Sequence, residues 1–222
     1  RRFLLLVSLF TPFLLRAEVT VFTIDQAQSS LTISGTLLGN PLQEQAPGSL
    51  TTDYFGTIVA DVTDTTIEFV GGSEIRANDS GTWQPAEGGE AGSAPANYGA
   101  QASLLFISGV AALRHIVLDV ASPPLPITGG TYPSESMTFS FPTNASTGAA
   151  SGSGSEPLAD HSTNNIGTVA GITTQNGSLV LIIPIQVTTY ASFLASNDIA
   201  ITLEGQLVAQ TPAANRPEIQ KL

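Results

Sequence analysis

Hydrophobic and polar residues alternate with a period of two along most of the chain after residue 17. The clearest case is the segment 137–141, where Met137, Phe139 and Phe141 are separated by polar residues. Such alternation puts every second side chain on the same face of a β-strand. No segment after residue 17 has the three-to-four-residue spacing of an amphipathic helix. The pattern therefore predicts an all-β fold.

Pairs of alternating segments joined by short polar stretches predict antiparallel hairpins. The first predicted hairpin pairs residues 19–24 with residues 30–38 across the polar stretch 25–28. The second pairs residues 56–62 with residues 66–70, which have inward apolar and outward polar positions.

A third predicted hairpin has the strongest local signal in the sequence. It joins residues 169–174 to residues 179–189 through Asn176-Gly177. Asn-Gly is favoured in a type I′ turn because both central residues need a positive φ. Pro184 lies inside the second of these strands and cannot donate a ladder hydrogen bond, so it predicts an edge or a bulge there.

These hairpins predict one antiparallel domain over residues 18–210, a sandwich or a barrel of about ten strands. Two long polar segments, 77–100 and 142–166, are predicted to be loops, and residues 211–222 a loose tail. The remaining predicted strands are 102–107, 113–120, 137–141 and 199–209.

The first seventeen residues resemble a secretory signal. Arg1 and Arg2 precede an apolar run over residues 3–15, and Ala17 precedes the first acidic residue. The run is shorter than the roughly 20 apolar residues that span a bilayer. We therefore expect an N-terminal signal helix over residues 1–17 and export to the periplasm, the cell surface or the medium. A retained anchor is the alternative.

Charge is distributed unevenly between this segment and the remainder. All eighteen acidic residues lie from Glu18 onward, with only four of the seven basic ones, so residues 18–222 carry a net charge of −14. Nucleic acids and anionic membranes are bound through clustered Lys and Arg, so both are disfavoured as partners. The chain has no Cys, which excludes disulfides and thiolate metal sites.

Few residues suggest catalysis or metal binding. His115 is predicted to lie mid-strand as a structural imidazole, and His161 follows Asp160 in a loop rich in Ser and Asn. A triad built on His161 is the alternative, but the chain has no Gly-x-Ser-x-Gly motif. Two distant histidines do not make a zinc site, and the acidic residues lack calcium-loop spacing. The sequence therefore predicts no catalytic residue, metal or cofactor.

Trp83 and Tyr98 are the candidate ligand-binding residues. Both lie in the predicted loop 77–100, and Trp83 is the sole tryptophan. Aromatic rings exposed in such a loop could stack on sugar rings of a glycan. The alternative is that Trp83 folds back over the core.

Strand and turn patterns recur over most of the chain after residue 17, in the segments 30–35 (SLTISG), 47–51 (PGSLT), 56–62 (GTIVADV), 69–73 (FVGGS), 94–99 (APANYG), 162–165 (STNN), 196–198 (SND) and 203–209 (LEGQLVA). Together these segments resemble a group of uncharacterised exported bacterial proteins that often carry a C-terminal PEP-CTERM sorting segment. The resemblance implies an exported β fold rather than a chemistry, and the stretch after Ala209 lacks the Pro-Glu-Pro motif of that segment.

Ile24-Asp25 at the end of the first predicted strand is followed by Ser29-Ser30. This opening resembles that of YceI-type lipocalin-like barrels. The resemblance implies a lipid-like ligand in a barrel lumen. We therefore expect an exported, non-enzymatic protein with a structural or interaction role. The alternative is a binding module, for a lipid-like ligand in the lumen or for a glycan on Trp83 and Tyr98.

Overall fold

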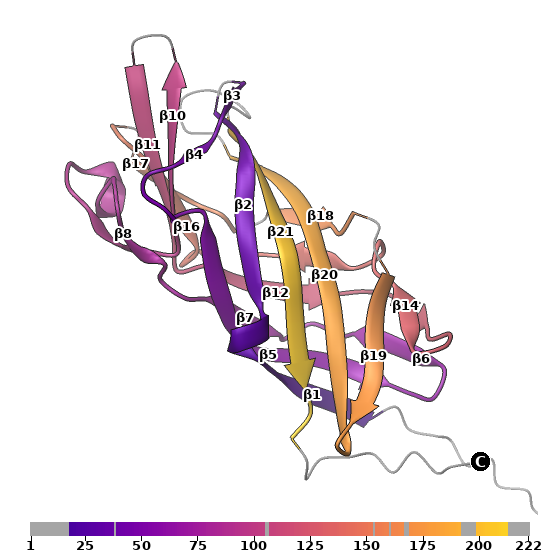
Figure 1. Cartoon of the computed structure of the whole chain (residues 1–222). Helices are drawn as coiled ribbons and strands as arrows, with labels where there is room; N and C mark the ends of the chain where they lie inside the picture. The colour runs from indigo at the N-terminus through magenta and orange to yellow at the C-terminus, as the bar shows by residue number, and fades with distance from the viewer. Residues whose placement is uncertain are drawn as a thin grey trace, which may run out of the picture.

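The part of the chain that the structure describes is built of β-strands and two short 3-10 turns (Figure 1). Its predicted all-β class is confirmed. Among the residues described below, no helix is long and apolar enough to cross a membrane. The predicted signal segment and most of the predicted tail lie outside the described residues. The computed structural model describes residues 18–37, 39–104, 107–152, 154–159, 161–166, 169–191 and 199–212.

Fourteen strands of the described chain form one antiparallel sheet, here called the large sheet. Its main path runs β14-β19-β20-β21-β1-β5-β7-β12-β15-β18, with β2, β3, β6 and β13 attached beside it. Its strands are β1 (Glu18–Ile24), β2 (Ser30–Leu37), β3 (Asn40–Pro41), β5 (Thr51–Val62), β6 (Thr66–Phe69), β7 (Glu74–Ala77), β12 (Val117–Ala121), β13 (Leu125–Pro126), β14 (Thr131–Pro133), β15 (Thr138–Ser140), β18 (Ser162–Asn164), β19 (Val169–Gln175), β20 (Ser178–Ala191) and β21 (Ile199–Gln210).

Two smaller sheets lie beside it. The five-stranded one has the order β17-β16-β11-β10-β4, and the two-stranded one pairs β8 with β9. In Figure 1, β10 and β11 project together at the upper left, beside β2. The strands are β4 (Gln43–Glu44), β10 (Tyr98–Leu104), β11 (Ile107–Arg114), β16 (Thr147–Ala150) and β17 (Gly154–Pro157), and then β8 (Gly81–Trp83) and β9 (Ala94–Ala96).

The two segments predicted as long loops contain strands, which corrects that expectation. Residues 77–100 include β8, β9 and a 3-10 turn, η2 (Glu87–Gly89), and residues 142–166 include β16, β17 and β18. Most of these strands have three or four residues and few apolar positions. Alternation needs a longer segment to be recognised. The described chain therefore has 21 strands rather than about ten.

The first predicted hairpin is wrong, because β1 and β2 do not pair with each other. Both pair antiparallel with the same two strands, β5 and β21, so they follow one another in one position of the sheet. The 3-10 turn η1 (Gln26–Gln28) between them leaves the strand direction unchanged. Ser29 keeps the ladder connected, because its hydroxyl accepts from the Val208 N–H at 2.9 Å and donates to the Val208 carbonyl at 3.1 Å.

The predicted strand 113–120 is also wrong, because it is two strands in different sheets. His115 has a φ of 54° and interrupts the strand between β11 and β12. The next residue, Ile116, is buried, and its N–H donates to Asn97 Oδ1 at 2.9 Å. His115 is therefore an exposed residue at the crossing between the two sheets, and not a mid-strand imidazole.

The other two predicted hairpins are confirmed. β5 pairs with β6, and β19 pairs with β20 across Asn176 and Gly177, which have φ angles of 49° and 83°. Pro184 lies in β20 beyond its last pair with β19, where its missing N–H breaks no rung of that ladder.

The large sheet is tied back to itself at the end of its path. Asn165, just after β18, is buried, and its side chain donates to the Pro184 carbonyl of β20 and accepts from the Gln186 N–H, both at 2.8 Å. The Ile166 N–H donates to the Gln186 carbonyl at 2.8 Å. β18 thus meets β20 on the side that β19 has left free.

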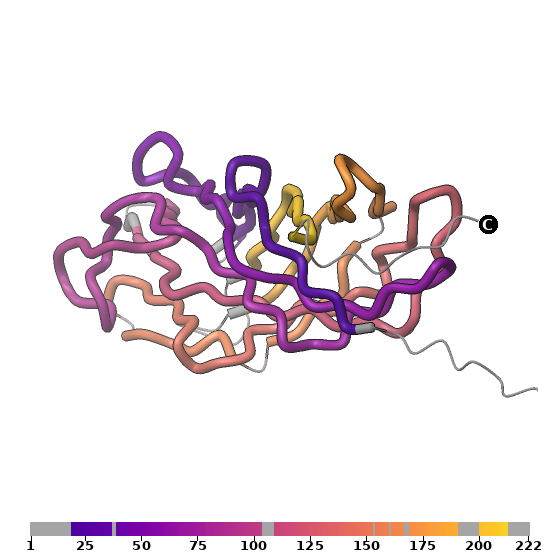
Figure 2. The backbone as a smooth tube through the Cα atoms, turned by 90° about the horizontal axis from the view of Figure 1, so that it is seen from below, coloured from indigo at the N-terminus to yellow at the C-terminus, as the bar shows by residue number. Residues whose placement is uncertain are grey.

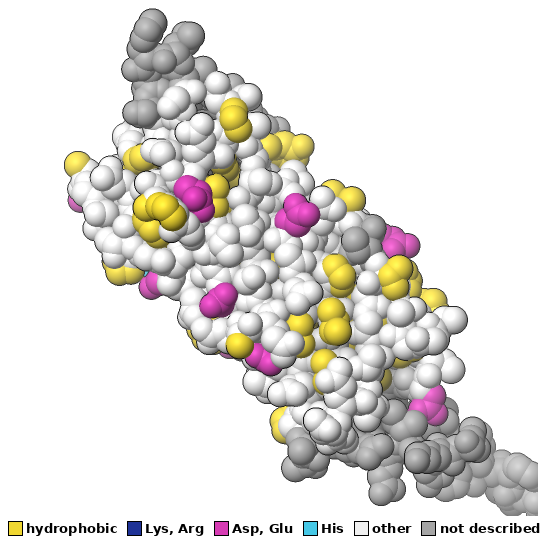
Figure 3. Space-filling model, viewed as in Figure 1, with side chains coloured by type: hydrophobic (Ala, Val, Ile, Leu, Met, Phe, Trp, Pro, Cys, Tyr) yellow, Lys and Arg dark blue, Asp and Glu magenta, His cyan; other side chains and the backbone are white. Residues whose placement is uncertain are grey.

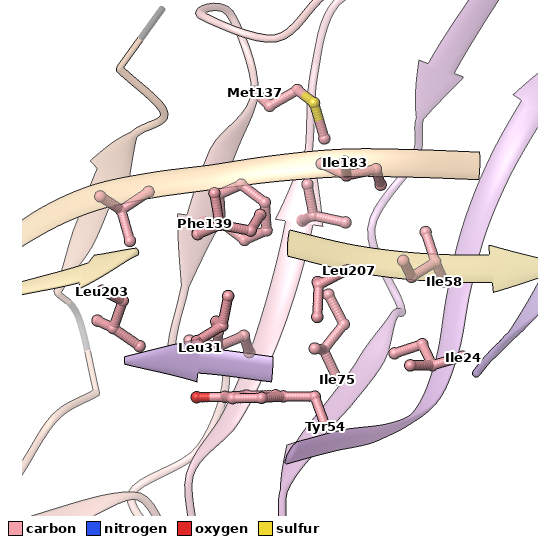
Figure 4. Packing of buried hydrophobic residues seen from close by; sticks show 14 of the residues in the cluster. Ile24, Leu31, Tyr54, Ile58, Ile75, Met137, Phe139, Ile183, Leu203 and Leu207 are labelled. Carbon is pink, nitrogen blue, oxygen red and sulfur yellow. The ribbon is translucent and has the colours of Figure 1, made fainter. Parts of the chain in front are cut away.

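One apolar core joins the large and the five-stranded sheets. Side chains such as Leu31, Phe139 and Leu207 face one another inside it (Figure 4). Tyr54 of β5 and Tyr98 of β10 are fully buried, with their hydroxyl oxygens 2.9 Å apart. Figure 2 shows the yellow segment of β21 between indigo and orange segments on the upper side, as expected from its pairing with β2 and β20. The tyrosine pair therefore links strands of different sheets across the core.

Candidate functional site

A polar cleft of about 230 Å³ lies where the turn η2 meets the end of β11 and the β16–β17 hairpin. We call it the Arg114 cleft. It differs from the core in having charged and hydroxyl-bearing side chains on its walls. Its lining residues are Glu87, Gly88, Arg114, His115, Thr147 and Ser155.

The walls of the cleft come from segments far apart in the sequence. Arg114, the last residue of β11, is paired with Thr147 of β16, so the two lie side by side in the five-stranded sheet. Gly89 packs against the turn between β16 and β17, where a Cβ atom would lie 2.9 Å from the Ala150 carbonyl oxygen. The absence of a side chain at Gly89 therefore lets η2 close one side of the cleft.

Arg114 forms the floor of the cleft and is only 3% exposed. Its Nε donates to the Pro95 carbonyl at 3.1 Å, and its Nη2 donates to the carbonyls of Trp83 at 3.2 Å and Pro85 at 2.5 Å. These bonds fix the plane of the guanidinium. Nη1 has no hydrogen-bond partner among the described residues, and it is not one of their fully buried unpaired atoms. Nη1 is therefore the group that Arg114 can offer to a ligand.

No carboxylate in the described part of the chain lies within 4.0 Å of this guanidinium. The one ion pair found there joins Arg76 to Glu74 at 2.9 Å on the surface. Burial lowers the pKa of Arg114, while the more distant carboxylates of Glu87 and Asp79 raise it in part. Arginine remains charged at neutral pH, so the cleft holds a largely desolvated positive charge.

Trp83 and Tyr98, the predicted ligand-binding residues, do not form an exposed pair. Tyr98 is 0% exposed. Trp83 is half-buried, with its ring against Gly81 and Gly99 and its Nε1 donating to Ser80 Oγ at 2.8 Å. Trp83 has therefore folded back onto β10, and its backbone carbonyl accepts one of the hydrogen bonds from Arg114.

The two histidines lie in separate places. His115 is exposed at the Arg114 cleft. His161 is half-buried, and its Nδ1 lies 3.3 Å from Thr189 Oγ1. Asp160, the partner that a triad on His161 would use, lies outside the described residues. No group of three or more His, Cys, Asp or Glu side chains that could hold a metal ion occurs in the described ranges.

A small gap lies in the apolar core between β2 and β21 on one side and β10 and β11 on the other. Its volume is about 20 Å³, which is room for about one water molecule. An acyl chain of several carbons does not fit into it. The lining residues are Ile33, Leu42, Tyr98, Ala100, Ala111, Leu113 and Ile201.

In comparisons with known proteins, no family model, curated protein or solved structure matches the chain. The role of the cleft is therefore argued from its own residues. The sequence does not single out Arg114 as a site residue, because the predicted strand 113–120 makes it one side chain on the face of a continuous strand. The available signal was its rarity, since it is one of four basic residues after residue 17.

Proposed function

We propose that this chain is the folded domain of an exported, non-enzymatic protein with an interaction role, and that it binds its ligand in the Arg114 cleft. The observation that supports this most is that Nη1 of Arg114, at the floor of the cleft, has no hydrogen-bond partner among the described residues. Buried charges in proteins are normally paired with an opposite charge. A ligand would supply the partner that the described residues do not.

Export is the second part of the proposal, and the sequence supports it. The apolar segment 3–15 with its two leading arginines fits a chain sent to the periplasm, the cell surface or the medium. The tie between β18 and β20 through Asn165 supports the closed, barrel-like form of the expected fold. The cleft lies on the neighbouring five-stranded sheet, which shares one apolar core with the large sheet.

The alternative binding modes have less support than the cleft. The gap of about 20 Å³ in the core is too small for a lipid-like ligand. A glycan stacked on Trp83 and Tyr98 would need both rings at the surface, and Tyr98 is buried between the sheets. A glycan remains a candidate ligand only through polar contacts in the Arg114 cleft.

A fragment screen by nuclear magnetic resonance tests the proposed function. The chain, labelled with ¹⁵N, is mixed with a library that contains neutral, acidic and basic small molecules. We expect hits to shift the amide signals of Gly88, His115 and Ser155 together, because these residues line one cleft. Hits that gather on another surface, or a library that shifts none of these signals, would show that the cleft is not the binding site.

A further inference from the structure

We infer that the ligand of the Arg114 cleft is a singly charged carboxylate that carries hydroxyl groups, as the acidic sugars do. The inference rests on the proposed function and adds the chemical class of the ligand. It is carried by three features of the cleft wall: the free edge of Arg114, the hydroxyl groups of β16 and β17, and the carboxylate of Glu87.

The free edge of Arg114 selects an anionic oxygen. Its Nη1 carries two N–H donors, and the bonds of Nε and Nη2 to three carbonyls hold them in place. Guanidinium donors pair with planar carboxylates at short distance and are stronger than neutral donors. Because Arg114 is 97% removed from solvent, a carboxylate that reaches Nη1 displaces little bound water from it. The cleft is therefore preorganised for one carboxylate.

The walls beside Arg114 select hydroxyl groups. Thr147 and Ser155 each present a hydroxyl, and His115 presents an exposed imidazole. None of these three side chains has a hydrogen-bond partner among the residues that the structure describes. Hydroxyl and imidazole groups both donate and accept hydrogen bonds, as the hydroxyls of a sugar do. The polar wall therefore matches a ligand with several hydroxyls better than an aliphatic acid.

Glu87 limits the charge of the ligand. It is exposed at the rim of the cleft, on the turn η2. Its carboxylate can accept a hydrogen bond from a ligand hydroxyl, but it repels a second negative charge, which is how a site rejects a wrong ligand. A phosphate dianion is thus disfavoured against a carboxylate. The volume of about 230 Å³ equals that of about eight water molecules, which suits one sugar-sized molecule.

The competing explanation is that Arg114 only clips the segment 83–95 onto β11 through its three carbonyl contacts. That explanation accounts for the burial of Arg114 and needs no ligand. It makes no use of Glu87, Thr147 or Ser155. The two explanations therefore differ in what substitutions at the exposed residues of the cleft do to binding.

Titration of the ¹⁵N-labelled full chain with sodium glucuronate tests the inference, with glucose, acetate and glucose 6-phosphate as comparison probes. We expect glucuronate to shift the amide signals of Gly88, His115 and Ser155, and to bind at least tenfold more tightly than any comparison probe. Glu87→Gln is expected to strengthen glucuronate binding about two- to fivefold by removing a like charge. Ser155→Ala is expected to weaken it by a similar factor.

Arg114→Lys is expected to weaken glucuronate binding more than tenfold, because Lys cannot keep three carbonyl contacts and still offer a donor to the cleft. Arg76→Gln is the matched control, since Arg76 is an exposed arginine elsewhere on the surface, and it should leave binding unchanged. If Arg114→Lys fails to fold, the exposed variants at Glu87 and Ser155 still decide the matter.

Each contrary outcome has a distinct meaning. Equal binding of glucose and glucuronate would overturn the carboxylate assignment while leaving the cleft as a binding site. Tighter binding of glucose 6-phosphate would overturn the role given to Glu87 and the limit to one charge. Fragment hits in the cleft without any response to glucuronate would overturn this inference alone, and the absence of both would overturn the proposed function too.

Discussion

At the scale of single residues, three tyrosines that are buried to the same extent differ in what their hydroxyls contact. The hydroxyls of Tyr54 and Tyr98 lie 2.9 Å apart, and that of Tyr98 also donates to the Leu31 carbonyl at 3.3 Å. The hydroxyl of Tyr132 is buried without a hydrogen-bond partner among the described residues. An unsatisfied buried hydroxyl costs about 1–3 kcal/mol, so the three groups contribute differently to stability.

Removal of the Tyr132 hydroxyl should not weaken the fold. Tyr132→Phe keeps the ring, which lies 6.0 Å from that of Phe69 between ring centres, and removes an unpaired polar atom. We expect the free energy of unfolding in urea to stay the same or to rise by about 1 kcal/mol. Tyr98→Phe, the matched control, leaves the Tyr54 hydroxyl and the Leu31 carbonyl without this partner. It should lose about 1–3 kcal/mol, and a loss of that size for Tyr132→Phe would contradict the prediction.

The same tyrosines should make the fold sensitive to alkali. Burial raises the pKa of Tyr54, Tyr98 and Tyr132 above the usual value. Each folded phenol therefore holds its proton at a pH where the unfolded one, with a pKa of about 10, has lost it. The stabilisation is complete below pH 10 or so and falls as the pH rises further, by up to about 4 kcal/mol per pH unit for three groups.

Urea unfolding at a series of pH values between 8 and 11 measures this effect. Tyr132→Phe should reduce the slope above pH 10 by about one third, because one of three groups is gone. Tyr190→Phe removes an exposed tyrosine and should leave the slope unchanged. A free energy of unfolding that stays constant up to pH 11 would show that these phenols do not control alkaline stability.

At the scale of elements, the joint between β1 and β2 depends on one side chain. Ser29 is buried, and its hydroxyl takes the place of a backbone pair by bonding both to the N–H and to the carbonyl of Val208. Ser29→Ala leaves the Val208 N–H without its partner, whereas the Val208 carbonyl still accepts from the Asp25 N–H at 2.8 Å. We expect a loss of about 1–3 kcal/mol in the free energy of unfolding. Ser34→Ala, on an exposed position of β2, should change it by less than about 0.5 kcal/mol.

Hydrogen exchange can locate the same effect. In Ser29→Ala the amides of Val208 and its neighbours in β21 should exchange faster, while those of β10 and β11 stay protected. Uniform acceleration in every strand would mean that Ser29 acts on global stability alone. An unchanged Val208 amide would contradict the proposed role of the hydroxyl.

Elements could be predicted from the sequence where the turn itself carries the information. Asn176 and Gly177 adopt the positive φ angles that they favour, so the β19–β20 hairpin could be predicted from local chemistry. The stretch 25–28 is as polar as a turn, yet η1 keeps the strand direction because β5 and β21 flank both halves. His115 carries no turn signal, and only the positions of the two sheets require a break there. The continuous strand direction across residues 25–28 and the break at His115 both depend on pairing between strands far apart in the sequence.

At the scale of the whole molecule, the same limit applies to the candidate site. The Arg114 cleft combines segments around residues 87, 114, 147 and 155, and no local pattern shows that they meet. The sequence favours Trp83 and Tyr98 as binding residues, because aromatic residues in a long loop suggest a binding surface. The fold instead uses them to close the core and to hold Arg114. The sequence shows that Trp83 and Tyr98 are aromatic, but whether their rings are buried depends on how the strands are arranged in the fold.

Net charge is the property of the whole molecule that the sequence states directly, and it should make stability depend on salt. The chain carries a net charge of −11. Acidic side chains are scattered over the face shown in Figure 3, where no Lys or Arg is visible among the described residues. Repulsion among them opposes the compact state. Raising NaCl from about 0.01 M to about 1 M shortens the screening length from about 30 Å to about 3 Å.

We therefore expect the melting temperature to rise by about 2–4 °C over this range of salt, as a gain of about 1 kcal/mol would give in a chain of this size. A variant with Glu156→Gln and Glu204→Gln separates charge screening from other effects of salt, because both residues are exposed. It should melt higher than the parent chain in low salt and respond less to added NaCl. An equal response of variant and parent would show that salt acts through something other than the repulsion of surface carboxylates.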